Sequence, residues 1–318
     1  MTKKKVINYL RNLYTKINPT KNSLFLSALK IDRTGQVASD YIKELINCDK
    51  PIMIARFGSS ELCCTVEYLN SKTRFKYIKY ITSKINSYEF TDLIKYEVFT
   101  ASGIFPTTNK LLSRFSELMI QETSNVDVLG SWRVEESYLK NQLINTVVVK
   151  LTDIEPYYHD NPWSSALAGK KVLVIHPFAE SIESQYKKRE LLFKNPNILP
   201  KFELQVLKAV QTLSAEEGKS YNDWFDALGT MKNKIDKIDF DIAIIGCGAY
   251  GFPLASYIKN IGKKAIHMGG ATQILFGIKG KRWESNPFFQ NLMNEHWVRP
   301  SIEETPSKAH LQEDACYW

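Results

Sequence analysis

Short apolar runs alternate with amphipathic stretches along most of the chain. The runs suited to buried strands cover residues 51–57, 126–130, 146–149, 172–175, 202–206, 241–245 and 264–268. Helical spacing of apolar positions covers residues 62–69, most of 70–125, 180–193, 221–236 and 252–261. Strands that alternate with helices require crossover connections, which produce a parallel sheet with helices on both faces. The pattern therefore predicts an α/β fold with a Rossmann-like, doubly wound, mostly parallel sheet and a helical N-terminal region.

The pattern also divides the chain into four parts. We expect a basic helical arm over residues 1–50, a first α/β half over 51–168, a Rossmann-like second half over 169–285 and a tail over 286–318. The boundary between the halves falls in residues 153–171, which are rich in Pro, Asp, Asn and Gly. Aromatic residues end the tail, so we expect it to fold back onto the body as a clasp or, less simply, as a lid over the site.

The positive charge is concentrated at the N-terminus. The net charge is +8, and residues 1–30 hold seven Lys and Arg and no acid, which leaves about +1 for the other 288 residues. A body without a basic stripe argues against nucleic-acid binding. Apolar residues recur at helical spacing within the arm. Such a helix either packs on its own domain or lies on an anionic membrane surface, so peripheral membrane contact through residues 1–20 is one expectation.

The overall composition narrows the class of protein. Hydrophobic residues make up 44% and charged residues 24%, as in soluble globular proteins. No apolar run approaches the roughly 20 residues of a membrane span, and the first residues lack the pattern of a secretory signal. The five cysteines are odd in number and form no CxxC pair, which excludes a disulfide framework or zinc ribbon. We therefore expect a cytoplasmic protein, peripheral at the inner face of the membrane if the arm binds lipid.

A glycine-rich turn gives the first candidate site. Gly246, Gly248 and Gly251, with Tyr250 between them, stand between a predicted strand and a predicted helix. This GxGxxG context suits a diphosphate, because glycines allow close backbone approach and a helix N-terminus offers free N–H groups. The alternative is that the glycines serve only a tight turn and close packing. The acid that a dinucleotide ribose requires about 20 residues later is missing at 266–270, so NAD loses support.

Two further strand ends carry candidate chemistry. His176 follows the strand at 172–175, where an imidazole could contact a phosphate, transfer a proton or be merely structural. The strand at 264–268 ends in a glycine pair, and a basic segment follows. This group consists of Gly269, Gly270, Gln273, Lys279, Lys281, Arg282 and Trp283. It predicts an anion site with a tryptophan to stack on a base or sugar, or else a basic loop with a packed tryptophan.

The strand at 51–57 also ends in polar residues. Arg56, Gly58, Ser59 and Glu61 lie at its junction with the next helix. Arg56 and Glu61 could form only an ion pair. In a catalytic interpretation Glu61 is a base or metal ligand, and Arg56 binds phosphate or orients Glu61. Arg299 and Glu303 in the tail are weaker candidates.

Two of these segments together resemble the GT-D class of bacterial glycosyltransferases. They are Arg-Phe-Gly-Ser-Ser-Glu at 56–61 and the strand, glycine turn, helix and strand at 241–270. Segments 176–182, 221–225, 246–251 and 269–283 are similar to uncharacterised relatives among capsule and surface-polysaccharide proteins. The family's first segment is typically Arg-Phe-Gly-Asp-Gly-Glu, whose Asp-x-Glu is linked to divalent metal and sugar nucleotide. Ser59 replaces that Asp here, so Asp127, Asp160 or the diphosphate would have to complete a Mn²⁺ or Mg²⁺ site with Glu61.

The resemblance implies a glycosyltransferase of bacterial surface-polysaccharide biosynthesis. The donor would be a nucleoside-diphosphate sugar, with UDP favoured, and the acceptor a glycan or a lipid-linked glycan. It implies a diphosphate at Gly246–Gly251 and Gly269–Gly270, with Arg56, Lys279 and Arg282 as supporting cations. Glu61 is the favoured carboxylate and His176 the reserve proton-transfer group. Two alternatives stay open: an NAD(P)-dependent oxidoreductase, and a non-catalytic sugar-nucleotide-binding protein of the same pathway.

Overall fold

The computed structural model describes residues 2–19, 26–212, 220–307, 309–311 and 314–318. Its centre is one sheet of seven strands in the order β3-β2-β1-β7-β6-β4-β5, and every pair is parallel. The strands are β1 (Ile52–Ala55), β2 (Val128–Ser131), β3 (Val147–Lys150), β4 (Lys171–His176), β5 (Glu203–Lys208), β6 (Ile242–Ile245) and β7 (Lys264–His267). Each lies where an apolar run predicted it, and the α/β Rossmann-like fold is confirmed.

Two layers of helices cover the sheet because its central strands are apolar on both faces. In β1, Met53 and Ala55 point to one layer and Ile52 and Ile54 to the other. The first layer contains α3 (Ser59–Lys72), α5 (Asp92–Thr100), α6 (Asn109–Thr123), α9 (Trp224–Ile235) and α10 (Gly251–Asn260). The second contains α2 (Gln36–Asn47), α7 (Ala179–Tyr186), α8 (Arg189–Leu192), α11 (Thr272–Leu275), α12 (Lys281–Glu284) and α13 (Pro287–Leu292). The two hydrophobic cores lie on either side of this one sheet.

Capping residues explain several differences between predicted and observed helix bounds. Asp223 accepts a hydrogen bond from the Asp226 N–H, so α9 begins at Trp224 and not at residue 221. Thr91 and Thr108 cap α5 and α6 in the same way within the predicted helical stretch. The stretch at 180–193 is divided into α7 and α8.

The segment at 153–171 is folded onto the core. It contains most of three short 3₁₀ helices, at Leu151–Ile154, Pro156–Tyr158 and Trp163–Leu167. The Trp163 ring is fully buried, and its Nε1–H donates to the Ile154 carbonyl at 3.1 Å. These residues pack with α2 against the second face of the sheet, so both predicted halves share one core.

The strand order creates a crevice at the carboxyl edge of the sheet. The chain leaves β4 for β5 by way of α7 and leaves β6 for β7 by way of α10. Since β4 and β6 are neighbours, these connections depart in opposite directions, and loops on either side of the gap separate. In α/β sheets such a switch point is the usual ligand position.

Candidate functional site

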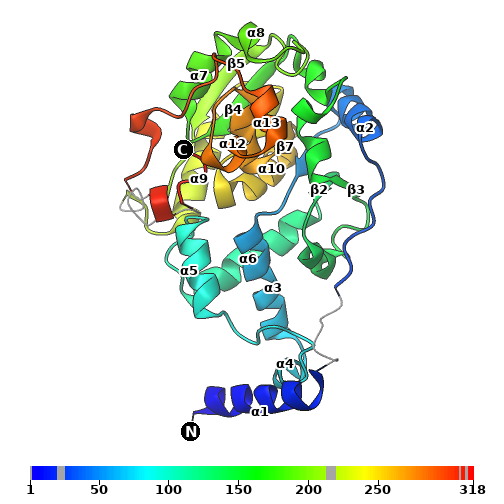
Figure 1. The fold of residues 1–318 in the computed structure, drawn as a ribbon, viewed down its shortest axis with the longest axis vertical. Coiled ribbons are helices and arrows are strands. Elements are labelled where there is room, and N and C mark those ends of the chain that lie inside the picture. The colour runs from blue at the N-terminus through cyan, green and yellow to red at the C-terminus, as the bar shows by residue number, and fades with distance from the viewer. Residues whose placement is uncertain (1, 20–25, 213–219, 308, 312–313) are drawn as a thin grey trace.

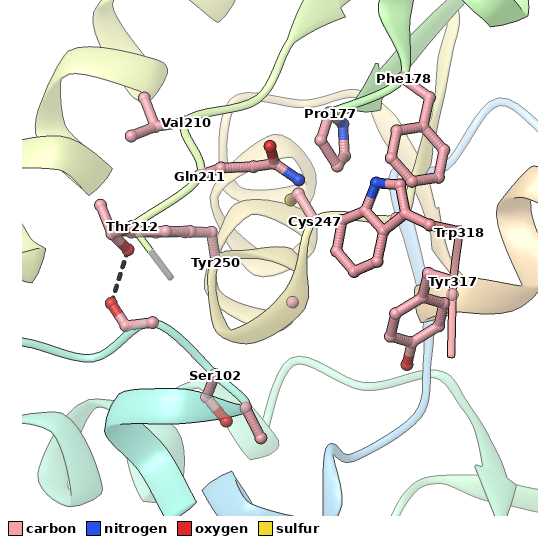
Figure 2. Close-up of a pocket in the computed structure, with 15 residues that line it drawn as sticks. Ser102, Pro177, Phe178, Val210, Gln211, Thr212, Cys247, Tyr250, Tyr317 and Trp318 are labelled. Carbon is pink, nitrogen blue, oxygen red and sulfur yellow. Dashed lines mark hydrogen bonds between the residues drawn. The ribbon is translucent and has the colours of Figure 1, made fainter. Parts of the chain in front are cut away.

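A pocket lies at this switch point. It surrounds about 570 Å³ of unoccupied space, part of it open to solvent. The turns after β4, β5 and β6 line it with Pro177–Phe178, Val210–Thr212 and Gly246–Gly248. Figure 2 shows Phe178, Tyr317 and Trp318 along one side of the pocket, and Val210, Gln211, Thr212 and Tyr250 along the other.

The described side chains that line the pocket are uncharged, and four of them are aromatic. None of the described residues that line it carries a charged side chain. The Tyr250 ring stacks on Trp224 at 4.9 Å, and the Phe178 and Trp318 centroids are 5.8 Å apart. Polar side chains on the wall include Ser102, Gln211 and Thr212, and the Thr212 hydroxyl contacts the Gly103 carbonyl and the Tyr250 hydroxyl. A flat, polar-edged ring such as a nucleobase matches this wall.

Close packing accounts for two of the three glycines in GxGxxG. A Cβ on Gly246 would lie 2.7 Å from the Gly269 carbonyl oxygen, and one on Gly251 would lie 2.2 Å from His267 Cε1. Gly248 differs in two ways. Its φ is +56°, and a Cβ placed on it would meet no atom closer than the Ser102 carbonyl oxygen, at 4.0 Å. Gly248 is therefore the glycine at which the backbone opens towards the pocket.

The glycines after β7 make room for side chains of this chain. A Cβ on Gly269 would lie 2.9 Å from Arg56 Nη1, and one on Gly270 would lie 2.2 Å from Tyr317 Cε1. The Tyr317 carbonyl accepts from the Gln273 side-chain amide at 3.0 Å, and its hydroxyl accepts from Arg282 at 3.0 Å. These contacts fix the tail at the mouth of the pocket beside Arg56.

Arg56 directly follows β1 and lies against Gly269 at this mouth. Its guanidinium lies over the Trp132 ring at 4.8 Å, and its buried Nε has no hydrogen-bond partner among the described residues. Burial lowers the pKa of Arg56, and the nearby Tyr317, Glu61 and Glu155 oppose that shift. A buried donor without an acceptor costs about 1–3 kcal/mol, so this guanidinium is suited to an anionic ligand.

Glu61 lies in the first turn of α3 and forms no ion pair with Arg56 within the described residues. Its carboxylate packs against Gly58, where a Cβ would lie 2.1 Å from Oε2, and it accepts a hydrogen bond from the Ser60 hydroxyl at 3.1 Å. The Ser60 hydroxyl also contacts Ser102 Oγ, on the pocket wall, at 2.6 Å. Ser59 is exposed at the start of α3. The ion-pair alternative therefore does not describe this junction.

The donor set around Glu61 does not fit a protein-held metal ion. No three His, Cys, Asp or Glu side chains of the described chain gather in a way that could bind one. Asp127 lies at the opposite edge of the sheet, where it accepts from the Met53 N–H at 2.7 Å and pairs with Lys259 at 2.8 Å. Asp160 lies on an exposed loop beside Asn195. We therefore assign no step of a reaction to a bound Mn²⁺ or Mg²⁺.

His176 is a buried structural group. Its Nδ1 accepts from the Phe178 N–H at 3.0 Å, which shapes the turn after β4. Burial lowers the pKa of His176 to about 3, so the ring is neutral at physiological pH. It is 2% exposed and does not line the pocket, which places the proposed reserve proton-transfer group behind the wall.

The basic segment after β7 mostly holds the tail. Trp283 packs near Phe289 and Tyr317 and does not line the pocket, so its ring is not placed to stack on a ligand there. The Lys279 N–H donates to the Val298 carbonyl, and the Lys281 ammonium lies 3.9 Å from Asp314. Of the predicted supporting cations in this segment, Arg282 is the one that contacts the mouth, through Tyr317.

The candidates in the tail lie at its surface. Arg299 pairs with Glu284 at 2.6 Å, and Glu303 is exposed. Neither lines the pocket.

Two residues near Arg56 were missed by sequence reasoning. Trp132 directly follows β2, as Arg56 follows β1, and its Nε1–H donates to the Phe57 carbonyl at 3.0 Å. Glu155 follows β3 and is 8% exposed. Burial raises the pKa of Glu155 to about 7, against the opposing effects of the Tyr157 hydroxyl and of Arg56. Their position in the sequence could have identified them, because both residues come shortly after strands that end at the carboxyl edge of the sheet.

Comparison of the chain with protein-family models, with curated proteins and with solved structures finds no match.

Adding a methyl group at Gly251 should destabilise the fold through a steric clash, because alanine can adopt the backbone conformation of this residue. Gly251 has ordinary helical angles, so the cost of Gly251→Ala comes from the 2.2 Å approach to His267. We expect a loss of about 1–3 kcal/mol in the free energy of unfolding, measured by urea denaturation. Gly229→Ala on α9 is the control: nothing lies within 4 Å of its Cβ position, so a gain of about 0.5–1 kcal/mol is expected. Equal effects would contradict the packing role.

Glu155 should make stability fall as pH rises. Its pKa is raised from 4.5 to about 7 by folding, so the folded state holds the proton more tightly over this range. The Glu155→Gln variant lacks this dependence. Its free energy of unfolding should therefore rise relative to that of the parent as pH increases from about 4.5 to 7, by up to about 3 kcal/mol in all, and the difference should stay constant above about pH 7. The lowered pKa values of His176 and His267 act in the opposite direction but cancel in the comparison. Parallel pH profiles of urea stability in the two proteins would refute the assignment.

Proposed function

We propose that this protein is a glycosyltransferase that takes a sugar from a nucleoside-diphosphate donor, UDP-type favoured. The observation that carries the proposal is the pocket at the β4/β6 switch point, together with Arg56 beside its mouth, whose buried Nε has no hydrogen-bond partner among the described residues. The confirmed fold supports nucleotide binding at this edge. Sugar transfer, and an acceptor that is a glycan or lipid-linked glycan of a bacterial surface polysaccharide, rest on the family resemblance of segments 56–61 and 241–270.

The aromatic and the cationic parts of the site suit different parts of such a donor. The uncharged wall around Tyr250 and Phe178 suits the nucleoside, which needs stacking and a few polar contacts. The diphosphate would extend from Gly248 towards Arg56. Arg282, which donates a hydrogen bond to the Tyr317 hydroxyl, lies on the same side. We therefore propose that the diphosphate binds mainly at Arg56 and Gly248, and less at the glycines that packing already explains.

The reaction requires charge stabilisation and removal of one proton. The bond between the sugar anomeric carbon and the diphosphate oxygen breaks, and a bond from the acceptor oxygen to that carbon forms. Arg56 would neutralise the charge that develops on the departing diphosphate, which matters most where water is excluded. Glu61 is buried and does not itself line the pocket, and it is linked to the lining residue Ser102 through the Ser60 hydroxyl. It is the carboxylate that would accept the acceptor's hydroxyl proton.

The two alternatives make different demands on the same pocket. An NAD(P)-dependent oxidoreductase would need a ribose-binding carboxylate after β7, where the chain has His267 and Met268, both buried. A sugar-nucleotide-binding protein without activity would need only the pocket. Binding and turnover must therefore be measured separately.

Removing the Arg56 guanidinium should weaken binding of UDP. Loss of a charge-assisted contact of about 1.5–3 kcal/mol corresponds to a roughly 10- to 100-fold higher Kd for Arg56→Gln in titration calorimetry. Arg56→Lys should be intermediate, because it keeps the charge without the planar fork. Arg299→Gln, on the exposed pair with Glu284, is the matched control and should stay within about twofold. An unchanged Kd in Arg56→Gln, or stabilisation of the parent by NADH and not by UDP, would exclude this site assignment.

Removing the Glu61 carboxylate should separate chemistry from binding. Glu61→Gln keeps a group that can accept from Ser60, so we expect a UDP affinity within about threefold of the parent and at least about a hundredfold loss of donor turnover. Turnover is measured as nucleotide release from a panel of nucleotide sugars, with and without Mn²⁺. Full turnover in the variant would remove Glu61 from the reaction, and UDP binding without turnover by the parent on every donor would favour the non-catalytic alternative.

A further inference from the structure

Helix α1 (Lys3–Ile17) is attached to the body by its polar side. The Arg11 guanidinium donates to the carbonyls of Tyr80 and Ile85 at 2.6 and 3.0 Å, and lies over the Tyr80 ring at 4.2 Å. The Tyr80 hydroxyl donates to Asn8, and Lys4 pairs with Glu89 at 3.0 Å. Among the helix's apolar residues, Ile7 alone is buried. The helix thus turns towards the protein the side that would ordinarily face water.

The apolar side of α1 faces outward. Val6, Tyr9, Leu10, Leu13 and Ile17 are 38%, 61%, 40%, 43% and 69% exposed. At about 100° per residue these five side chains occupy one arc of about 100° that is opposite Arg11. We call this arc the apolar stripe. No described element of the chain covers it, and Figure 1 shows α1 at one end of the long axis, next to α4 (Lys76–Ile81) and remote from β5.

Positive charge borders the apolar stripe. The helix holds Lys3, Lys4, Lys5, Arg11 and Lys16 and no acid. By helical position Lys5 and Lys16 lie along one border of the stripe and Lys3 along the other. The neighbouring α4 adds two lysines and the exposed Ile78, which is 60% accessible. An exposed apolar arc with lysines at its borders has the chemistry of a helix in the plane of an anionic lipid surface.

We propose that α1 docks this protein on an anionic membrane by inserting the apolar stripe between lipid headgroups. The charge of α1 favours lipid over a second copy of the chain. Pairing two stripes would bring together two helices whose charged side chains are all positive. The contact is peripheral: fifteen residues span about 22 Å, less than the roughly 30 Å hydrocarbon core, and none of the described helices is both long and apolar enough to cross it. It would keep the site near a lipid-linked acceptor, but does not depend on the proposed transfer.

The test is co-sedimentation of the full chain with vesicles of phosphatidylcholine alone or mixed equally with phosphatidylglycerol. We expect at least about tenfold stronger partitioning onto the anionic vesicles, falling as salt is raised. The double variant Leu10→Glu/Leu13→Glu should lose at least about tenfold of it, and Lys5→Glu/Lys16→Glu several-fold. Ile144→Glu/Ile302→Glu, at two apolar positions that are 81% and 87% exposed elsewhere, should stay within about twofold.

Two further measurements separate this proposal from its competitors. Sedimentation equilibrium without lipid should show the same mass for the parent and the Leu10→Glu/Leu13→Glu variant; a parent dimer that this variant dissociates would overturn the proposal in favour of self-association. Equal partitioning of parent and stripe variant, or none on either vesicle, would also overturn it. UDP titration of the stripe variant should match the parent, so failure of membrane docking is distinguishable from failure of the nucleotide site.

Discussion

All seven strands run in the same direction, and this constraint determines where the chemistry of the molecule can lie. Parallel strands deliver every carboxyl end to one edge of the sheet. Arg56, Trp132 and Glu155 follow three successive strands, and the glycine turns follow β6 and β7, so residues far apart in the sequence meet there. The register of β1 and β7, in which Ile54 pairs with Ile266, places Arg56 against the backbone at Gly269. A one-residue shift in that register would turn the guanidinium to the other face of the sheet.

The sequence predicted the strands well because burial on both faces leaves continuous apolar runs, as at 172–175 and 241–245. Strand order, in contrast, depends on which helices cross which face, and nothing local to β1 indicates that β7 is its neighbour. A pocket lies at the edge where the sequence predicted a ligand, since Gly248 follows β6, but its walls come from residues such as Ser102 and Trp318 that lack a motif. Burial was equally invisible: the sequence left open whether His176 transfers a proton or is merely structural, and its buried surroundings keep it neutral.

Two sequence patterns had more than one physical origin, and the structure separates them. A GxGxxG turn indicates that a backbone approaches something closely, but the partner can be a phosphate or a neighbouring ring; at Gly251 it is His267, and at Gly248 it is the pocket. Helical periodicity likewise establishes that α1 has an apolar side without saying where that side points. The polar contacts of Arg11 with Tyr80 and Ile85 decide its direction.

The central position of β7 has a consequence for biosynthesis. During translation β1, β2 and β3 leave the ribosome first, and β7 emerges last of the strands, about 210 residues after β1, yet it occupies the middle of the finished sheet. Until then the nascent chain presents two unpaired apolar edges, on β1 and on β6, and each is a template for wrong pairing. Closure of the sheet is therefore the insertion of one short strand between two edges that are already formed.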